Sequence, residues 1–148
     1  MERPSVRLVL AVSLDGRLAP ASGGAAQLGG AGDRHVLEQA LAWSDAVLIG
    51  AGTLRAHRCT CLIHEQQLLA QRKQDGRPLQ PTALVVSRRP DFCQEWPFFQ
   101  QEIERHLLTP DRLSVDGFST THRLQASWET TLVEVAALGF HRLVLLGG

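Results

Sequence analysis

Residues 45–53 read Asp-Ala-Val-Leu-Ile-Gly-Ala-Gly-Thr, and this stretch decides the fold class. It is a short apolar run that ends at Gly50. Runs without polar alternation are typical of strands that lie inside a parallel sheet with both faces covered. The stretch therefore predicts a buried parallel strand over Asp45–Ile49 whose carboxyl end meets a glycine turn.

Three further runs have the character of sheet strands. Val6–Val12 is apolar on both of its alternating faces, which predicts another strand covered on both sides. Thr82–Ser87 reads as a third buried strand. Arg142–Leu146 returns to the strand pattern and runs into Gly147.

Segments with helical spacing of apolar residues separate these runs. A helix is expected to open at Asp33, whose carboxylate suits the positive end of the helix dipole. A solvent-facing helix is expected over Glu65–Gln74, stopped by a following glycine. A third helix is expected over Thr130–Leu138. Thr131 and Glu134 have the spacing of a capping box, and a glycine follows the last residue.

The repeated order of strand, helix and strand predicts an α/β fold with a mainly parallel central sheet and helices on both faces. A chain of 148 residues is in the size range of one domain and buries about two-thirds of its unfolded surface. Residues 88–126 show no pattern that assigns an element. One domain over residues 1–148 is the expected organisation.

The overall charge excludes some classes of partner. Fifteen Lys and Arg residues balance fifteen Asp and Glu residues, so the net charge is zero and no overall field gathers polyanions. We therefore expect neither a nucleic-acid nor a membrane partner. The first apolar run is too short for a signal peptide or a membrane span, which predicts a cytoplasmic protein. Three cysteines, an odd number, are expected to be free thiols.

The glycine turn is the first candidate binding site. Gly50, Gly52 and Thr53 stand between a predicted strand and a helical segment, where backbone amides at a helix start can point at a phosphate. The turn lacks the third spaced glycine of the full dinucleotide fingerprint. It can equally be a tight strand-to-helix turn capped by Thr53. Gly147-Gly148 offers the same two readings, a close approach to a pyrophosphate or a simple turn.

A basic turn follows the predicted strand at Thr82–Ser87. In Ser87-Arg88-Arg89-Pro90, the arginines come at the sheet edge where open α/β folds bind ligands. A guanidinium there can hold the 2′-phosphate that distinguishes NADPH from NADH. The alternative is a solvated basic turn that ends at a proline.

Other chemistry has little support in the sequence. His57, Cys59, Cys61 and His64 fall close together, but Cys-x-Cys lacks the spacing of zinc knuckles and has no second cysteine pair, so no metal site is expected. The sequence has no Walker lysine motif and no distinct Ser-His-Asp order, so it does not favour a kinase or a hydrolase.

Four motifs in order resemble one family. Ala11–Ala19, Ala-Val-Ser-Leu-Asp-Gly-Arg-Leu-Ala, resembles the opening of the reductase domain of bacterial riboflavin-biosynthesis deaminase/reductases. Ile49–Leu54 looks like the Gly-x-Gly-Thr cofactor turn of that family. Val85–Arg88 and Leu145–Gly148 occupy the places of its third strand and its Glu-Gly-Gly loop. The resemblance covers essentially the whole chain.

This resemblance implies a dihydrofolate-reductase-like fold, NADPH as hydride donor and a homodimer. It implies reduction of 5-amino-6-(5-phosphoribosylamino)uracil to its ribitylamino form, and further strands after residue 148, so the chain is expected to be incomplete there. Ser13 and Asp15 become candidate catalytic residues that face the substrate. The residues implied for the cofactor are Gly50, Gly52, Thr53, Ser87, Arg88, Gly147 and Gly148.

The chain departs from the family on the substrate side. The family usually carries Asp-Asp-Pro, a Leu-Thr segment and an arginine after the cofactor turn, where this chain has His57–Leu62. Leu146 stands in place of the glutamate of Glu-Gly-Gly. Ala42 stands where relatives have a helix arginine that contacts substrate.

With these departures, a different set of residues is expected to bind the phosphate of the substrate. Arg55, His57 and Arg58 form a cationic set suited to a phosphoribosyl group. Two alternatives stay open: a related reductase of another small carbonyl or imine substrate, and a nucleotide-binding protein that carries out no reduction.

Overall fold

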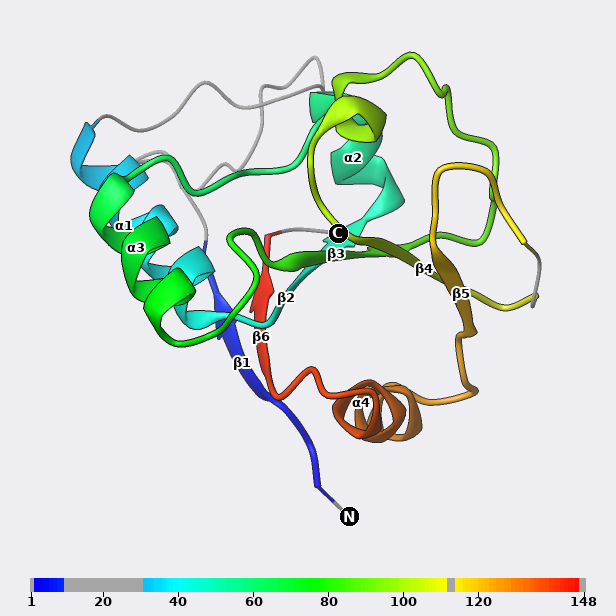
Figure 1. Cartoon of the computed structure of the whole chain (residues 1–148). Coiled ribbons are helices and arrows are strands. Elements are labelled where there is room, and N and C mark those ends of the chain that lie inside the picture. Colours follow the sequence, from blue (N-terminus) through cyan, green and yellow to red (C-terminus); the bar gives the residue numbers. More distant parts are fainter. Residues whose placement is uncertain (1, 10–30, 112–113, 147–148) are drawn as a thin grey trace, which may run out of the picture.

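The computed structural model describes residues 2–9, 31–111 and 114–146. Within these ranges, six strands form one parallel sheet in the order β1-β6-β2-β3-β4-β5 (Figure 1). The strands are β1 (Ser5–Leu8), β2 (Ala46–Gly50), β3 (Thr82–Val86), β4 (Arg105–Thr109), β5 (Thr120–Arg123) and β6 (Arg142–Leu145). The predicted parallel sheet is confirmed.

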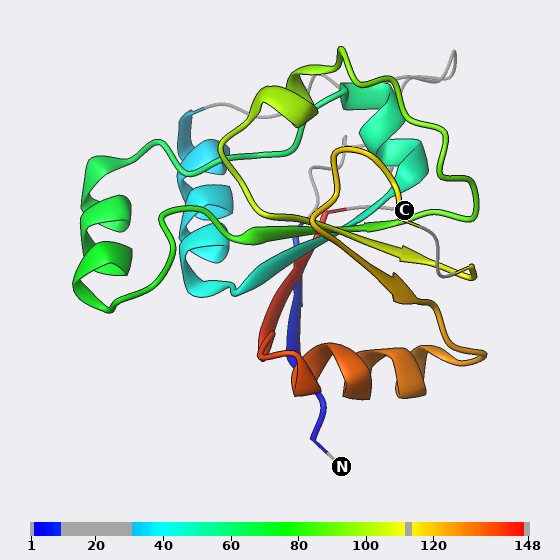
Figure 2. The same ribbon diagram turned by 45° about the vertical axis from the view of Figure 1, so that its right-hand side comes forward.

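Helices cover both faces of this sheet (Figure 2). They are α1 (Ala31–Trp43), α2 (Ala51–His57), α3 (Gln66–Gln74) and α4 (Trp128–Ala137), with a short 3-10 helix η1 (Pro97–Gln100). Side chains of β2 alternate between the two layers, because successive residues of a strand point to opposite faces. Ala46 and Leu48 pack in the cluster that includes Val135 of α4. Val47 and Ile49 pack in the clusters of α1 and α2.

The central strands confirm the buried runs read from the sequence, but β1 does not. Its four residues are all exposed, with Val6 at 47% and Leu8 at 59%. The prediction of a strand covered on both faces was wrong because β1 lies at the sheet edge and, among the described residues, pairs only with β6. Residues 10–12 of that predicted strand lie outside the described residues.

The unassigned region 88–126 contains η1, β4 and β5. Its core is a group of aromatic rings whose centroids lie 5.1–6.4 Å apart: Phe92, Trp96, Phe98, Phe99 and Phe118. Gly117 lies beside them at φ +89°, where an added Cβ would come within 2.5 Å of the Phe99 ring. These contacts follow neither strand nor helix periodicity, so the sequence pattern did not predict the elements.

The start of α4 also differs from its prediction. Ser127 is the N-cap, and its Oγ accepts the backbone N–H of Thr130 at 3.2 Å. Thr131 does not form a capping box with Glu134; its hydroxyl donates to the Ser127 carbonyl at 3.0 Å. The helix thus begins earlier than predicted, while the glycine stop is confirmed by Gly139 at φ +102°.

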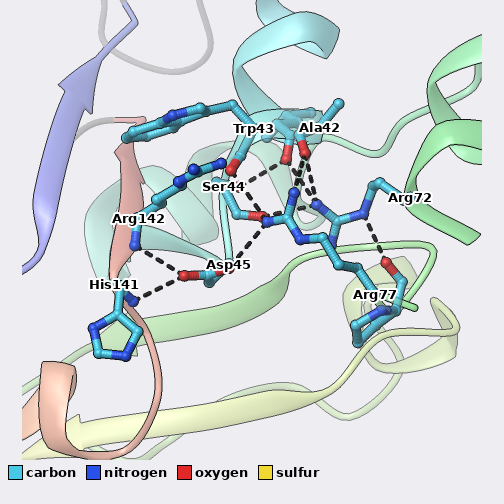
Figure 3. A network of polar contacts seen from close by, with 10 residues as sticks. Ala42, Trp43, Ser44, Asp45, Arg72, Arg77, His141 and Arg142 are labelled. Carbon is cyan, nitrogen blue, oxygen red and sulfur yellow. Dashed lines mark hydrogen bonds and ion pairs between the residues drawn. The ribbon is translucent and has the colours of Figure 1, made fainter. Parts of the chain in front are cut away.

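Two arginines satisfy the carbonyl groups at the end of α1 (Figure 3). Arg72 of α3 is buried and donates to the carbonyls of Ala42 and Ser44 at 2.9 and 2.8 Å. Arg77 donates to the same two carbonyls at 3.0 and 2.7 Å. Burial lowers the pKa of Arg72 to about 10, so the side chain stays charged at neutral pH. These bonds add to those of Ser44, whose N–H and Oγ donate to the carbonyl of Leu41 at the end of α1.

Asp45 joins this helix end to the start of β6, the strand next to β2 (Figure 3). One carboxylate oxygen accepts from Arg77 at 2.9 Å. The other accepts the backbone N–H groups of His141 and Arg142 at 2.8 and 3.0 Å. A single side chain therefore ties together the α1–β2 junction, the segment before β3 and the start of β6.

Candidate active site

The glycine turn and the basic turn lie side by side at the carboxyl edge of the sheet. Gly50, the last residue of β2, pairs with Val86, the last residue of β3. The chain continues from Gly50 into α2, while after Val86 it continues into Ser87 and Arg88. Parallel strands bring their carboxyl ends together in this way, and open α/β sheets bind ligands at that edge.

The helix that begins at this edge has no side-chain cap. Gly50 is the N-cap of α2, and Thr53 lies inside the first turn rather than capping it. The reading of a turn capped by Thr53 was therefore wrong. The first N–H groups of an α-helix have no partner within the helix, so those of α2 are donors at the sheet edge.

Ser87 holds the basic turn in shape. Its side chain is buried, and its Oγ donates to the Arg89 carbonyl at 2.5 Å and accepts the Arg89 N–H at 3.1 Å. The single hydroxyl proton is thus used within the turn. Arg88 and Arg89 are exposed, and within the described part of the chain neither side chain makes an ion pair. Two guanidinium groups are therefore available at this edge.

Arg55 belongs to the same side of the site. Its Nη2 lies 3.4 Å from a carboxylate oxygen of Asp91, and its guanidinium lies over the Phe92 ring at 5.4 Å. Asp91 and Phe92 follow the basic turn, so Arg55 holds that segment against α2. The predicted substrate residues stay close together, since Arg55 and His57 lie in the last turn of α2 and Arg58 is its C-cap, which puts Arg55 and Arg58 on one face of the helix.

Arg58 has an unusual backbone conformation. It is the C-cap of α2 at φ 61°, and within the described residues it is the one non-glycine residue with positive φ. Its N–H donates to the Leu54 carbonyl at 2.6 Å, and its carbonyl accepts the Phe98 N–H at 3.0 Å. Its side chain is exposed. A left-handed conformation costs a side chain about 1–2 kcal/mol, and such strain collects at functional sites.

The segment after Arg58 is held to the body of the protein by side chains rather than by a strand partner. We call residues 58–64, which join α2 to α3, the strap. Gln101 binds both backbone groups of Thr60, at 3.2 and 3.0 Å. Gln80 does the same for Ile63, at 2.8 and 2.9 Å. Neither glutamine is predicted from the sequence, because no local pattern marks residues that lie 41 and 17 positions from their partners.

Glu38 fixes the end of the strap. This buried carboxylate of α1 accepts the backbone N–H groups of His64 and Glu65, the latter at 2.9 Å. It thereby holds the two residues that precede α3, whose N-cap residue Glu65 makes no side-chain capping bond. Burial alone would raise the pKa of Glu38, but these two N–H groups, with the charges of His64 and Arg34, bring the pKa below its ordinary value.

We expect the stability of the protein to depend on Glu38 in a pH-dependent way. A lowered folded-state pKa stabilises the fold above the unfolded pKa, about 4.3 for glutamate, and this contribution is lost as pH falls through the folded pKa. Glu38→Gln should therefore be less stable than wild type at pH 7, and the difference should shrink below about pH 4. Urea unfolding at several pH values measures this; a difference that stays constant down to pH 3 would contradict the assignment.

Comparison with known proteins identifies the family. A family model described as the RibD C-terminal domain matches residues 4–148. The chain belongs to this family. The resemblance read from the four motifs is confirmed.

Relatives of this RibD C-terminal domain share its fold. The form 2 structure of RibD from Acinetobacter baumannii has a TM-score of 0.81 at 24% identity, covering 99% of this chain and 40% of that one. A Thermotoga maritima structure, described as a diaminohydroxyphosphoribosylaminopyrimidine deaminase/5-amino-6-(5-phosphoribosylamino)uracil reductase, has a TM-score of 0.78 at 18% identity, covering 99% and 39%. The predicted dihydrofolate-reductase-like fold is confirmed.

A curated relative carries a functional name. The 2,5-diamino-6-ribosylamino-4(3H)-pyrimidinone 5′-phosphate reductase of Archaeoglobus fulgidus is 30% identical over 87 residues, which is 59% of this chain. The match covers 40% of that protein. The RibD C-terminal domain described here thus matches less than half of the length of this relative.

Several predicted site residues of the RibD C-terminal domain cannot be placed. Ser13, Asp15, Gly147 and Gly148 lie outside the described residues. Leu146, which stands in place of the family glutamate, is half-buried and packs with the cluster of α1.

Position 42 does not belong to this edge. Ala42 lies in the last turn of α1, next to the amino end of β2, whereas Gly50 marks the carboxyl end of that strand. The prediction that Ala42 replaces a substrate-contacting arginine at this site was wrong, because the strand separates the two positions.

The cysteines and histidines of the strap region do not gather into a metal site. Within the described residues, no group of three or more His, Cys, Asp or Glu side chains is arranged to hold a metal ion. Cys59, Cys61 and Cys93 are free thiols, as predicted. Desolvation and the neighbouring Cys59 raise the pKa of Cys61. No helix in the described parts of the chain combines the length and apolar character that a membrane span needs.

Proposed function

We propose that this RibD C-terminal domain is an NADPH-dependent reductase of riboflavin biosynthesis. Its proposed reaction reduces 5-amino-6-(5-phosphoribosylamino)uracil to the ribitylamino form. The observation that carries the proposal is the cationic edge at the carboxyl ends of β2 and β3, where the glycine turn adjoins Arg88 and Arg89. The name of the Archaeoglobus relative supports a phosphorylated pyrimidine as substrate.

The residues at this edge fit a dinucleotide with a 2′-phosphate. The uncapped start of α2 offers N–H donors to a phosphate group. Arg88 is exposed and suited to bidentate bonds with the 2′-phosphate, while Ser87 keeps the turn in place. Gly147 and Gly148 are proposed to pass under the pyrophosphate. When bound, NADPH supplies a hydride to the sugar carbon that carries the amino nitrogen.

The chain itself contributes mainly orientation. Arg55, His57 and Arg58 are proposed to hold the 5′-phosphate of the substrate, since all three are exposed at the end of α2, where the strap begins. Ser13 and Asp15 are proposed to face the reacting end of the substrate. A substrate held at both ends reacts faster because its reacting carbon is kept in place.

The composition of the strap favours a second candidate. His57–Leu62 contains no acidic residue, although relatives have an Asp-Asp-Pro segment there. A reductase of another small carbonyl or imine substrate is therefore the alternative within the same fold. A protein that binds the nucleotide without reducing anything is the third.

Substrate-dependent oxidation of NADPH by the purified protein separates these candidates. The proposal expects turnover of the phosphoribosylaminouracil, and much weaker turnover of its dephosphorylated form because Arg58 then has no phosphate to bind. Turnover only of unrelated carbonyl compounds would favour the second candidate. NADPH binding with no turnover of any compound would favour the third.

Replacement of Arg58 by glycine should increase the stability of the protein and weaken its binding of the substrate. Arg58→Gly removes the strain of the left-handed conformation and should raise the free energy of unfolding by about 0.5–1 kcal/mol. It also removes the guanidinium and should raise the KM for the phosphorylated substrate about tenfold. Urea unfolding and steady-state kinetics measure the two effects.

Arg58→Ala is the matched control for this pair of measurements. It removes the charge and keeps the Cβ, so it should raise the KM without the gain in stability. An unchanged KM in both variants would show that Arg58 does not bind the substrate.

We also propose a cytoplasmic homodimer. The exposed Val6 and Leu8 on the edge strand β1 support contact with another protein surface. The balanced net charge supports a small-molecule substrate rather than a nucleic acid.

A further inference from the structure

The strap is held at its start by one short segment of the chain. The Gln101 side-chain amide accepts the N–H of Thr60 through Oε1 and donates to the carbonyl of Thr60 through Nε2. This is the bonding that a neighbouring strand would give to one residue. Arg58 lies two residues before Thr60, and its carbonyl accepts the N–H of Phe98 in η1 at 3.0 Å. Three hydrogen bonds thus join residues 98–101 to residues 58–60.

This segment is in turn fixed to the sheet. Arg105, the first residue of β4, donates through Nη1 to the carbonyls of Phe98 and Gln101 at 3.2 and 2.8 Å. Its Nε donates to the carbonyl of Gly117 at 2.9 Å. The position of the Gln101 amide is therefore set by a strand of the rigid sheet.

The hydrogen bonds on both sides of Arg58 fix its backbone conformation and therefore the direction in which its side chain leaves the chain. The backbone of Arg58 is in the left-handed region, which a non-glycine residue leaves readily when neighbouring bonds do not hold it. The Leu54 carbonyl holds the N–H of Arg58, and the N–H of Phe98 holds its carbonyl. Gln101 holds Thr60, two residues further on. Loss of the Gln101 bonds would free the strap to relax and would move the guanidinium.

We propose that Gln101 is a positioning residue that aims Arg58 at the phosphate of the substrate. The inference rests on the proposed function, because it takes the start of the strap as the phosphate-binding part of the site. Gln101 acts through the strap backbone and has no contact with cofactor or substrate in this account. Gln80 has a lesser part, because the Ile63 that it binds is also anchored by its own side chain, which is 1% exposed.

The test compares Gln101→Met with wild type. Methionine has a similar length and volume but makes neither hydrogen bond. Isothermal titration with ribose 5-phosphate reports on the phosphate grip alone, titration with NADPH reports on the cofactor edge, and steady-state kinetics separates KM from kcat. Gln94→Met is the matched control, since Gln94 also donates its side-chain amide to a backbone carbonyl, that of Asp116, but away from the strap.

We expect Gln101→Met to bind ribose 5-phosphate about five- to tenfold more weakly and to raise the KM by the same factor. Its kcat and its NADPH affinity should stay within about twofold of wild type, and Gln94→Met should match wild type throughout. Gln80→Met should show a smaller loss of ribose 5-phosphate affinity. A fall in kcat and in the active fraction with unchanged KM would show that Gln101 is merely structural.

The remaining outcomes separate this inference from the proposed function. If wild type binds ribose 5-phosphate and Gln101→Met binds it equally well, the positioning role is overturned and the proposed function stands. If wild type binds ribose 5-phosphate but reduces no phosphoribosylaminopyrimidine, the proposed function fails, and the titrations still decide the role of Gln101. Failure of wild type to bind ribose 5-phosphate overturns the inference.

Discussion

Asp45→Ala should lower the free energy of unfolding by about 3 kcal/mol. The carboxylate accepts three hydrogen bonds, from the Arg77 guanidinium and from the backbone N–H groups of His141 and Arg142. Bonds to a charged group contribute about 1.5–3 kcal/mol each. We expect a loss below the sum of the three, because the Asp45 side chain is 27% exposed and water recovers part of the loss.

Thermal and urea unfolding measure this effect. A loss of 3 kcal/mol corresponds to a fall in Tm of about 6–12 °C for a chain of this size. Asp91→Ala is the control, because the Arg55–Asp91 pair is exposed at 3.4 Å and should contribute less than about 0.5 kcal/mol. Equal and small effects of both substitutions would show that the network in Figure 3 does not hold the α1–β2 junction to β6.

Arg88→Ala should weaken NADPH binding about ten- to a hundredfold and leave NADH binding nearly unchanged. A guanidinium bonded to the 2′-phosphate contributes about 1.5–3 kcal/mol, and NADH has no such phosphate. Wild type should therefore prefer NADPH by the same factor. With NADH bound, the exposed Arg88 guanidinium is hydrated and makes no phosphate contact. Its removal should therefore change the affinity for NADH little.

Fluorescence titration of both cofactors against wild type and the variant decides this prediction. Arg89→Ala is the closest control, since Arg89 is the other exposed arginine of the turn. Equal affinities of wild type for the two cofactors, or an Arg88→Ala variant that keeps its preference, would place the 2′-phosphate elsewhere. If only Arg89→Ala loses the preference for NADPH over NADH, the contact with the 2′-phosphate belongs to Arg89 and not to Arg88.

The sequence was sufficient for the parts of the fold that depend on local pattern. The buried runs at 46–50 and 82–86 became central strands because apolar residues on both faces can be satisfied only between two layers. β1 has the same apolar character but lies exposed at the edge. Its position depends on which strands pair with it, and a run of seven residues carries no information on pairing.

The same distinction applies to the candidate site. Its cofactor side follows from a topological rule, since parallel strands bring Gly50 and Ser87 to one edge. Its substrate side depends on long-range side-chain bonds. Gln101 and Glu38 bind backbone groups 41 and 26–27 residues away, and no spacing in the sequence marks such pairs.

Arg55 shows both what local spacing predicts and what it leaves out. Arg55, His57 and Arg58 are close in sequence and all basic, so they were grouped as one phosphate grip. In the structure they stay close, since Arg55 and His57 lie in the last turn of α2 and Arg58 is its C-cap. The Arg55 side chain also contacts Asp91 and Phe92, 36 and 37 residues further along the chain. Local spacing therefore predicts that the three residues lie together, but not the distant partners of Arg55.

Transfer of an isotopic label tests the proposed reductase function most directly. Purified protein is incubated with NADPH deuterated at both C4 positions and with 5-amino-6-(5-phosphoribosylamino)uracil, and the product is analysed by mass spectrometry and NMR. We expect a ribitylamino product with one deuterium on the sugar carbon bonded to the amino nitrogen. Unlabelled product, or bound NADPH with no ribitylamino product, would contradict it.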